Sequence, residues 1–100
     1  MTIETTVWRL IGLTGSKRGV LTLGNGRLAF NGDEGTKFNV PLGAVSGIKF
    51  PWYYFHGGVK MTIANESYRF SFIEPHNEHA NIREGRRTGA RWKAALDRPN

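Results

Sequence analysis

The order of apolar and polar positions along the chain predicts strands first and one helix last. Short segments in which apolar side chains alternate with polar ones recur between residues 7 and 73. This period of two is typical of strands with one buried face. Beyond Pro75 the alternation stops, and apolar positions follow a three-four spacing typical of an amphipathic helix. The expected strands cover residues 7–13, 20–24, 27–30, 37–40, 47–50, 59–63 and 68–72, and the expected helix covers about residues 80–97.

Turn residues separate these segments. The Asn25-Gly26 pair is the strongest local signal, because both central positions of a two-residue hairpin turn need a positive φ angle. Residues 14–19 are mostly glycine and polar residues, so we expect a loop there between the first two strands. Pro41 cannot donate a backbone hydrogen bond to a neighbouring strand, so the fourth strand is expected to stop there.

The C-terminal helix carries one apolar stripe that contains two glycines. The stripe consists of Ile82, Gly85, Gly89, Trp92 and Leu96. Each glycine costs about 1 kcal/mol of helix propensity relative to alanine. That cost is explained if the helix lies very close to another part of the backbone, with the tryptophan and the leucine as its apolar anchor.

Seven antiparallel strands with exposed edges invite aggregation, and bending the sheet onto itself reduces that hazard. We therefore predict a mainly β fold: a seven-stranded, bent antiparallel barrel or sandwich capped by one C-terminal α-helix. One hundred residues without a linker or repeat are expected to form a single domain over residues 1–100. The expected core comprises Leu21, Leu28, Phe30, Phe38, Val40, Ile48, Met61, Ile63, Phe70, Phe72, Trp92 and Leu96.

Three stretches of the chain have a familiar pattern of apolar positions. They are residues 19–23 with residues 27–30, residues 38–42 with Val45 and Ile48, and the final helix with Trp92. Together they resemble the pleckstrin-homology-like superfamily, which includes the GRAM and bacterial PH domains. The resemblance implies a scaffold that binds lipids, peptides or other proteins, and it implies no particular ligand.

Composition adds a basic charge and excludes some chemistry. Fourteen Lys and Arg residues against eight Asp and Glu give a net charge of +6, which favours anionic partners such as nucleic acid, lipid headgroups or acidic proteins. The chain has no cysteine, which excludes a disulfide framework and a thiolate metal site. The first residues show no signal-peptide pattern, and no stretch approaches the roughly 20 apolar residues of a membrane span. We expect a cytoplasmic protein without a transmembrane segment.

Residues 50–58 contain the densest group of aromatic side chains. Trp52, Tyr53, Tyr54 and Phe55 follow one another shortly before a pair of glycines. A strand buries only every second side chain, so about half of these rings are expected to face outward or to cover a sheet edge. Two interpretations stay open: a satellite core, or an exposed patch for a partner protein, a second copy of the chain or a membrane interface. We take these four residues as the candidate binding patch and expect at least two of them to be exposed.

A basic pair, Lys17 and Arg18, lies in the expected loop between the first two strands. In lipid-binding PH domains this loop contacts the phosphoinositide headgroup, together with a basic residue late in the first strand and a Lys/Arg-x-Arg group in the second. Residues 20–24 contain no basic residue, although Arg9 and Arg27 are candidates to approach the loop. The resemblance thus implies anionic-lipid binding as an alternative function, and an ordinary solvated loop is the competing interpretation.

The helix carries a row of arginines opposite its apolar stripe. Arg83, Arg87 and Arg91 are spaced four residues apart, and residues 83–93 contain five basic residues and one acidic residue, a net charge of +4. A solvated helix face explains such a row, and the row is also an alternative binding site for anionic lipid or nucleic acid. Nucleic-acid binding would be expected to add aromatic rings near the charge for base stacking. It therefore ranks last among our hypotheses.

No residue set predicts catalysis, a bound metal or a cofactor. His76 and His79 with Glu74 and Glu78 have a loose metal-binding spacing, but a loop offers zinc neither rigid ligands nor supporting hydrogen bonds. The acidic residues are scattered, and no Ser or Thr adjoins a His. We therefore expect a non-catalytic module that binds a protein or peptide, or a second copy of itself as a homodimer, through the aromatic patch. Anionic membrane lipid is the first alternative partner and nucleic acid the second.

Overall fold

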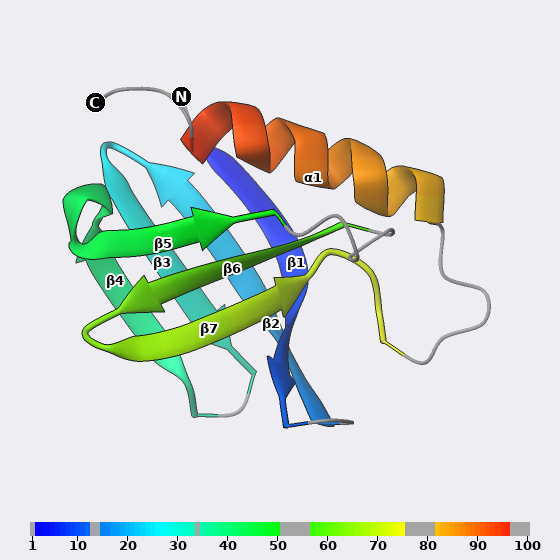
Figure 1. Ribbon diagram of the computed structural model, residues 1–100, viewed down its shortest axis with the longest axis horizontal. Helices are drawn as coiled ribbons and strands as arrows, with labels where there is room; N and C mark the ends of the chain where they lie inside the picture. The colour runs from blue at the N-terminus through cyan, green and yellow to red at the C-terminus, as the bar shows by residue number, and fades with distance from the viewer. Residues whose placement is uncertain (1, 13–14, 34, 51–56, 76–81, 97–100) are drawn as a thin grey trace.

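The fold follows the predicted order of strands and helix (Figure 1). The computed structural model describes residues 2–12, 15–33, 35–50, 57–75 and 82–96. The strands are β1 (Ile3–Ile11), β2 (Gly15–Gly24), β3 (Arg27–Gly32), β4 (Lys37–Pro41), β5 (Val45–Lys49), β6 (Gly58–Ile63) and β7 (Glu66–Ser71). A short 3-10 helix, η1 (Leu42–Ala44), connects β4 with β5, and α1 (Ile82–Leu96) follows β7.

Within the described residues, seven strands form one antiparallel sheet with the order β4-β3-β2-β1-β7-β6-β5. β1 joins the two halves of the sheet, because it pairs with β2 along its whole length and with β7 over a short stretch. The halves face each other: the ring centroids of Phe30 in β3 and Phe70 in β7 are 5.0 Å apart, and those of Phe38 in β4 and Tyr68 in β7 are 5.2 Å apart. Because these strands are not neighbours in the sheet, the sheet must be strongly bent. The predicted fold class, a mainly β bent sheet with one C-terminal helix, is confirmed.

Two hairpins turn at residue pairs with positive φ angles. Asn25 and Gly26, with φ of 54° and 73°, connect β2 to β3 as their sequence predicted. Ala64 and Asn65, with φ of 52° and 65°, connect β6 to β7. Two consecutive positive φ angles match the twist of antiparallel strands, so these turns fix the register of both hairpins.

α1 lies across one end of the bent sheet, beside β5 and β6 (Figure 1). Trp92 is fully buried: its indole N–H donates a 3.0 Å hydrogen bond to Thr5 Oγ1 in β1, and its ring stacks with Phe72 at a centroid distance of 6.3 Å. Gly85 and Gly89 are buried as well, and the backbone of residue 57 lies against them. The predicted helix and the close approach of its glycines to other backbone are therefore confirmed. No helix in the described part of the chain combines the length and the apolarity needed to cross a membrane.

The core fills the space between the two halves of the sheet and α1. Phe38, Val40 and Ile48, which we predicted as core residues, are only half-buried and pack against its margin. They lie on the edge strands β4 and β5, where a side chain has a neighbouring strand on one side only. The other predicted core residues are buried, and among the described residues so are six hydrophobic ones that were not predicted: Val7, Leu23, Leu42, Val45, Val59 and Tyr68.

The first hairpin is longer than predicted. β1 begins at Ile3 rather than at Val7, and residues 15–19, expected in a loop, form the first half of β2. Pairing with β1 continues without a break to Gly15, which lies opposite Ile11. The first four residues of β2 are all exposed, so this stretch has no hydrophobic alternation from which a strand could be recognised.

Candidate functional site

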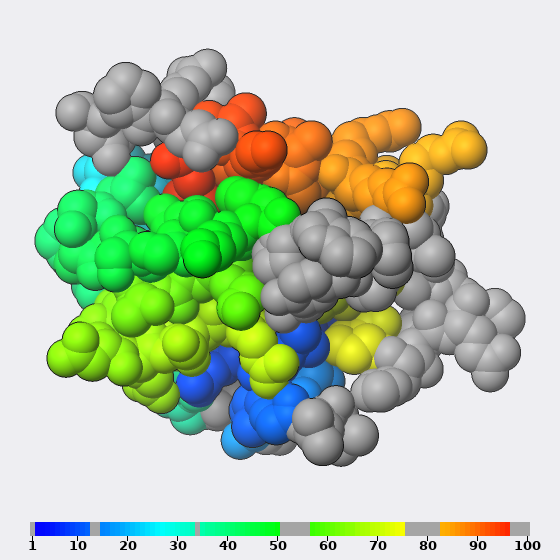
Figure 2. All heavy atoms as spheres, in the orientation of Figure 1, coloured from blue at the N-terminus to red at the C-terminus, as the bar shows by residue number. Residues whose placement is uncertain are grey.

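α1 carries most of the protein's excess positive charge on its outer side. The exposed charged residues there are Arg83, Glu84, Arg86, Arg87, Arg91 and Lys93. Five basic residues and one acidic residue give a net charge of +4, out of +6 for the whole chain. Figure 2 shows the helix along the upper edge of the molecule, with side chains of its first turns extending into solvent. Among residues 83–96, whose side chains the structure describes, Ala90 and Ala94 are the remaining exposed residues, so this part of the helix exposes no large apolar side chain.

The arginine row works against the stability of the helix, although Glu84 in the first turn and Lys93 in the last turn interact favourably with the helix dipole. Arg83, Arg87 and Arg91 are successive i, i+4 neighbours, and like charges at this spacing cost about 0.2–0.5 kcal/mol per pair. Arg83 also lies in the first turn, where the helix dipole disfavours a cation. The Glu84 carboxylate lies 3.7 Å from the Arg87 guanidinium, but both groups are exposed and such a pair contributes little. A local conflict of this kind is expected where a surface serves another purpose than stability.

Buried contacts hold this basic face in a fixed orientation. Trp92 and Leu96 lie in the core on the opposite side of the helix, and Gly89 packs closely on Gly57. Because that side of α1 is fixed against the sheet, the arginine row points away from the sheet. Three of the predicted site residues, the arginines of that row, therefore lie together on one exposed surface.

The second predicted basic pair is not in a loop. Lys17 and Arg18 belong to β2, so the second strand does contain basic residues, contrary to our prediction. Neighbouring residues of a strand face opposite sides of the sheet, so the two side chains cannot hold one ligand between them. Lys17 pairs across the strands with Arg9, and the Arg18 guanidinium lies 3.7 Å from the Asp33 carboxylate. Arg27 donates its hydrogen bonds to a residue of β4. The structure does not assemble these residues into one basic site.

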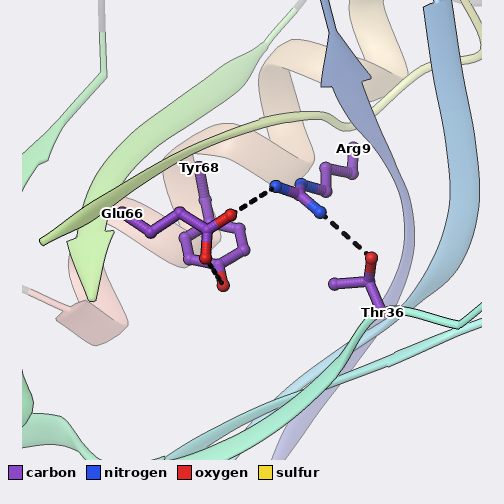
Figure 3. Close-up of polar contacts among 4 residues, drawn as sticks. All are labelled: Arg9, Thr36, Glu66 and Tyr68. Carbon is purple, nitrogen blue, oxygen red and sulfur yellow. Dashed lines mark hydrogen bonds and ion pairs between the residues drawn. The ribbon is translucent and has the colours of Figure 1, made fainter. Parts of the chain in front are cut away.

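Arg9 instead belongs to a cluster that connects three parts of the sheet (Figure 3). Its guanidinium donates to Thr36 Oγ1 at 3.0 Å and to Glu66 Oε1 at 3.3 Å, and it lies 4.6 Å from the centroid of the Tyr68 ring. The Tyr68 hydroxyl donates to the other oxygen of Glu66 at 3.1 Å. We call these four residues the clasp, because they tie β1 to β7 and to the residue before β4. Sequence reasoning missed the clasp. The signal that could have revealed it is Arg9, a charged residue two positions after Val7 and therefore on the same, buried face of β1.

The clasp should make the free energy of unfolding depend on pH in the alkaline range. Burial raises the pKa of Tyr68 above its ordinary value of 10.0; the hydrogen bond to Glu66 and its negative charge raise the pKa further, while Arg9 lowers it. A group whose pKa is higher in the folded state contributes stability that is complete below the unfolded pKa and is lost as the pH rises through the folded pKa. We therefore expect the free energy of unfolding to fall above about pH 10. The fall should be smaller in Tyr68→Phe, as measured by urea unfolding on both sides of that pH. An equally steep fall in Tyr68→Phe would show that another group causes it.

The outer face of β2, β3 and β4 holds a shallow, open depression of about 430 Å³. Lys37 is the one titratable residue in its lining, so the depression has no pair of groups for acid-base catalysis. Among the described residues, no group of three or more His, Asp or Glu side chains could hold a metal ion. The depression is lined by Val20, Thr22, Ala29, Phe30, Asn31, Lys37, Phe38 and Asn39.

Two predicted elements lie outside the described residues. One is the aromatic patch at residues 52–55, and the other is the His76 and His79 pair. The structure does show where the aromatic segment joins the fold on its C-terminal side. Gly57, two residues after the patch, lies against Gly85 in the first turn of α1.

Comparison with protein-family models, with curated proteins and with solved structures finds no match. Function therefore has to be inferred from the fold and from the side chains that it exposes.

Proposed function

We propose that this protein is a non-catalytic binding module of pleckstrin-homology-like architecture that binds an anionic partner through the outer side of α1. The observation that carries the proposal is a helix face with five exposed basic side chains and one acidic side chain, held in a fixed orientation by its buried side. The bent seven-stranded sheet followed by a single helix supports the architectural part, because it is the order of elements that the resemblance implies. Cytoplasmic localisation belongs to the same proposal.

The charge balance favours α1 over the first hairpin as the anion-binding surface. Arg9 and Arg18, the arginines nearest to Lys17, lie beside the carboxylates of Glu66 and Asp33. An incoming anion would have to compete with those carboxylates. Residues 83–93 of α1 themselves carry five cations and one carboxylate, a net charge of +4 within one helix, which attracts an anion.

The same charge argues against self-association through α1. Two copies that met at this face would bring equal positive charges together, and like charges across an interface are strongly unfavourable. A homodimer would therefore need another surface, and the aromatic patch is the one that the sequence offers.

Retention on heparin, a general polyanion, tests the proposal. The test variant is Arg83→Gln with Arg87→Gln and Arg91→Gln; the control, Arg18→Gln with Lys37→Gln and Lys60→Gln, removes the same charge from the sheet. We expect the test variant to elute at clearly lower salt than the parent, and the control to elute close to the parent. The test variant should also melt at the same temperature as the parent or higher, because like-charge pairs are removed. Equal elution of both variants would show that only net charge matters and would overturn the proposal.

Protein binding through the aromatic patch is a second candidate. The run of four consecutive aromatic residues favours it, because large aromatic side chains dominate binding energy where a partner buries them. Trp52→Ser with Tyr54→Ser should then leave the melting temperature nearly unchanged and abolish self-association or partner binding. Sedimentation at several concentrations alongside a thermal melt measures both. Unfolding of this double variant would assign the rings to the core.

A further inference from the structure

We infer that the partner of α1 is a nucleic-acid duplex, bound through its phosphate backbone without selection of base sequence. The inference rests on the proposed anion-binding function and specifies the chemical class of the anion. It depends on which side chains α1 exposes, which it buries, and how the exposed ones are spaced.

The outer side of α1 does not suit the core of a protein interface. Such cores depend on aromatic or aliphatic side chains that become buried in pockets of the partner, and charged residues are depleted there. Among the described side chains of α1, residues 83–96, the exposed ones are charged except for Ala90 and Ala94. An acidic protein would therefore meet only solvated charges, each of which contributes little.

The same helix does not suit insertion into a membrane surface. A helix that lies in the membrane interface buries its apolar side among the acyl chains. The apolar side of α1 is already used, because Trp92 and Leu96 are buried in the protein core. α1 could therefore bind a lipid surface only by electrostatic attraction, which contributes about 1 kcal/mol for each basic residue near the headgroups.

A duplex compensates for the missing apolar contacts by its charge density. It carries one phosphate charge for about every 1.7 Å of its axis, and each cation that pairs with a phosphate releases a condensed counterion. Four of the five cations on α1 are arginines, whose planar guanidinium donates two parallel hydrogen bonds to a phosphate. The surface thus has the chemistry that phosphodiester binding requires.

The spacing of the side chains fits an extended backbone. At a rise of about 1.5 Å per residue, the α-carbons of Arg83, Arg87 and Arg91 follow one another along the helix axis at intervals of about 6 Å. The helical period puts Arg86 and Lys93 on the other flank of the exposed face, with Ala90 and Ala94 between the two flanks. Small side chains between two groups of cations let a phosphate chain approach the helix closely.

Arginine can contact guanine edges in the major groove, but the described side chains of α1 include no group that selects adenine and no exposed ring for single-stranded bases. α1 has no Asn or Gln, which bind adenine edges in the major groove. Its one aromatic residue, Trp92, is buried, whereas proteins that bind single strands stack exposed rings on the bases. Contacts to phosphates position a protein on a duplex but carry no sequence information. Nucleic acid ranked last in our expectation from the sequence because rings for base stacking were missing near the charge, but only single strands need such rings. With the arginines of α1 on phosphates, we expect duplex binding that is independent of sequence.

Fluorescence anisotropy with a labelled mixed-sequence DNA duplex of about 20 base pairs tests this inference. If about four phosphates are neutralised, affinity should fall roughly 100-fold between about 50 and 200 mM salt. The slope of log affinity against log salt concentration should be shallower by about three in the α1 variant (Arg83→Gln, Arg87→Gln, Arg91→Gln). The control variant (Arg18→Gln, Lys37→Gln, Lys60→Gln) should keep the slope of the parent. A second duplex of unrelated sequence should bind within about threefold of the first.

Three further probes separate this inference from the proposed function: polyglutamate, vesicles of phosphatidylcholine and phosphatidylserine, and a single strand of the same length. If vesicles or polyglutamate bind in a way that depends on α1 and the duplex does not, the inference is overturned and the proposed function stands. Tighter binding of the single strand than of the duplex also overturns the inference. If no probe responds to the α1 variant, both the inference and the proposed function are overturned.

Discussion

Replacement of Trp92 by alanine is expected to lower the free energy of unfolding by about 3–5 kcal/mol, the range for truncating a buried tryptophan. The indole has no solvent exposure, stacks with Phe72 and donates its N–H to Thr5 in β1. Truncation leaves a cavity between α1 and the sheet and leaves the Thr5 hydroxyl without its donor. Domains of this kind are stable by about 5–15 kcal/mol in total, so the loss is a large fraction of that stability. Urea unfolding followed by tryptophan-independent far-UV circular dichroism measures it.

Lys93→Ala is the matched control for this substitution. It removes a long side chain from the neighbouring position of the same helix, but that side chain is exposed. Exposed substitutions of this kind usually change stability by less than about 0.5 kcal/mol. If Trp92→Ala unfolds at the same urea concentration as Lys93→Ala, α1 does not contribute to the core in the way described.

Those parts of the fold that depend on local pattern were predictable from the sequence. The Asn25-Gly26 turn needs only two adjacent residues that accept a positive φ, and both adopt it. The buried side of α1 was readable because Gly89, Trp92 and Leu96 recur at the helical period. Both signals lie within a few residues of each other, so no knowledge of the tertiary structure was needed.

The predictions that were wrong concern residues whose structure is decided by interactions with distant parts of the chain. Lys17 and Arg18 look like loop residues, but they form a strand because β1 extends beside them and pairs with each one. Phe38 and Val40 alternate like core residues, but β4 is an edge strand, and strand order cannot be read from alternation. In each case the deciding partner lies elsewhere in the sequence or on the other side of the sheet.

The candidate site also has one part that was predictable from local sequence spacing and one part that was not. The arginine row of α1 was visible from the i, i+4 spacing, and the structure adds only that its opposite side is firmly buried. The clasp was not visible, because Arg9 and Glu66 are 57 positions apart in sequence. Within that clasp, Glu66 and Tyr68 share one strand face, which is a local pattern, but neither residue indicates which cation completes the group.

The close approach of Gly57 to α1 connects the stability of the fold with the position of the basic face. Gly57 has a φ of 87°, a backbone conformation that L side chains rarely adopt. A β-carbon at this position would overlap the backbone carbonyl of Gly85. The carbonyl of Gly57 also accepts a hydrogen bond from the Phe72 amide at 3.3 Å, so this backbone is held on both sides. Neither neighbour can move without a shift of α1 or of the segment after β7.

Gly57→Ala is therefore expected to destabilise the protein by more than about 2 kcal/mol, because backbone strain alone costs about 1–3 kcal/mol and the overlap with α1 adds to it. Gly43→Ala is the control, since no heavy atom lies within 4 Å of a β-carbon there, and it should change stability by less than about 0.5 kcal/mol. Thermal melts give the stabilities, and amide hydrogen exchange shows where the structure loosens. We expect faster exchange in α1 of Gly57→Ala and no change in the β2–β3 hairpin, because the strain acts at the contact with Gly85. Equal melting temperatures for the two variants would mean that α1 lies farther from the sheet, and that the orientation of its arginines is not fixed by this contact.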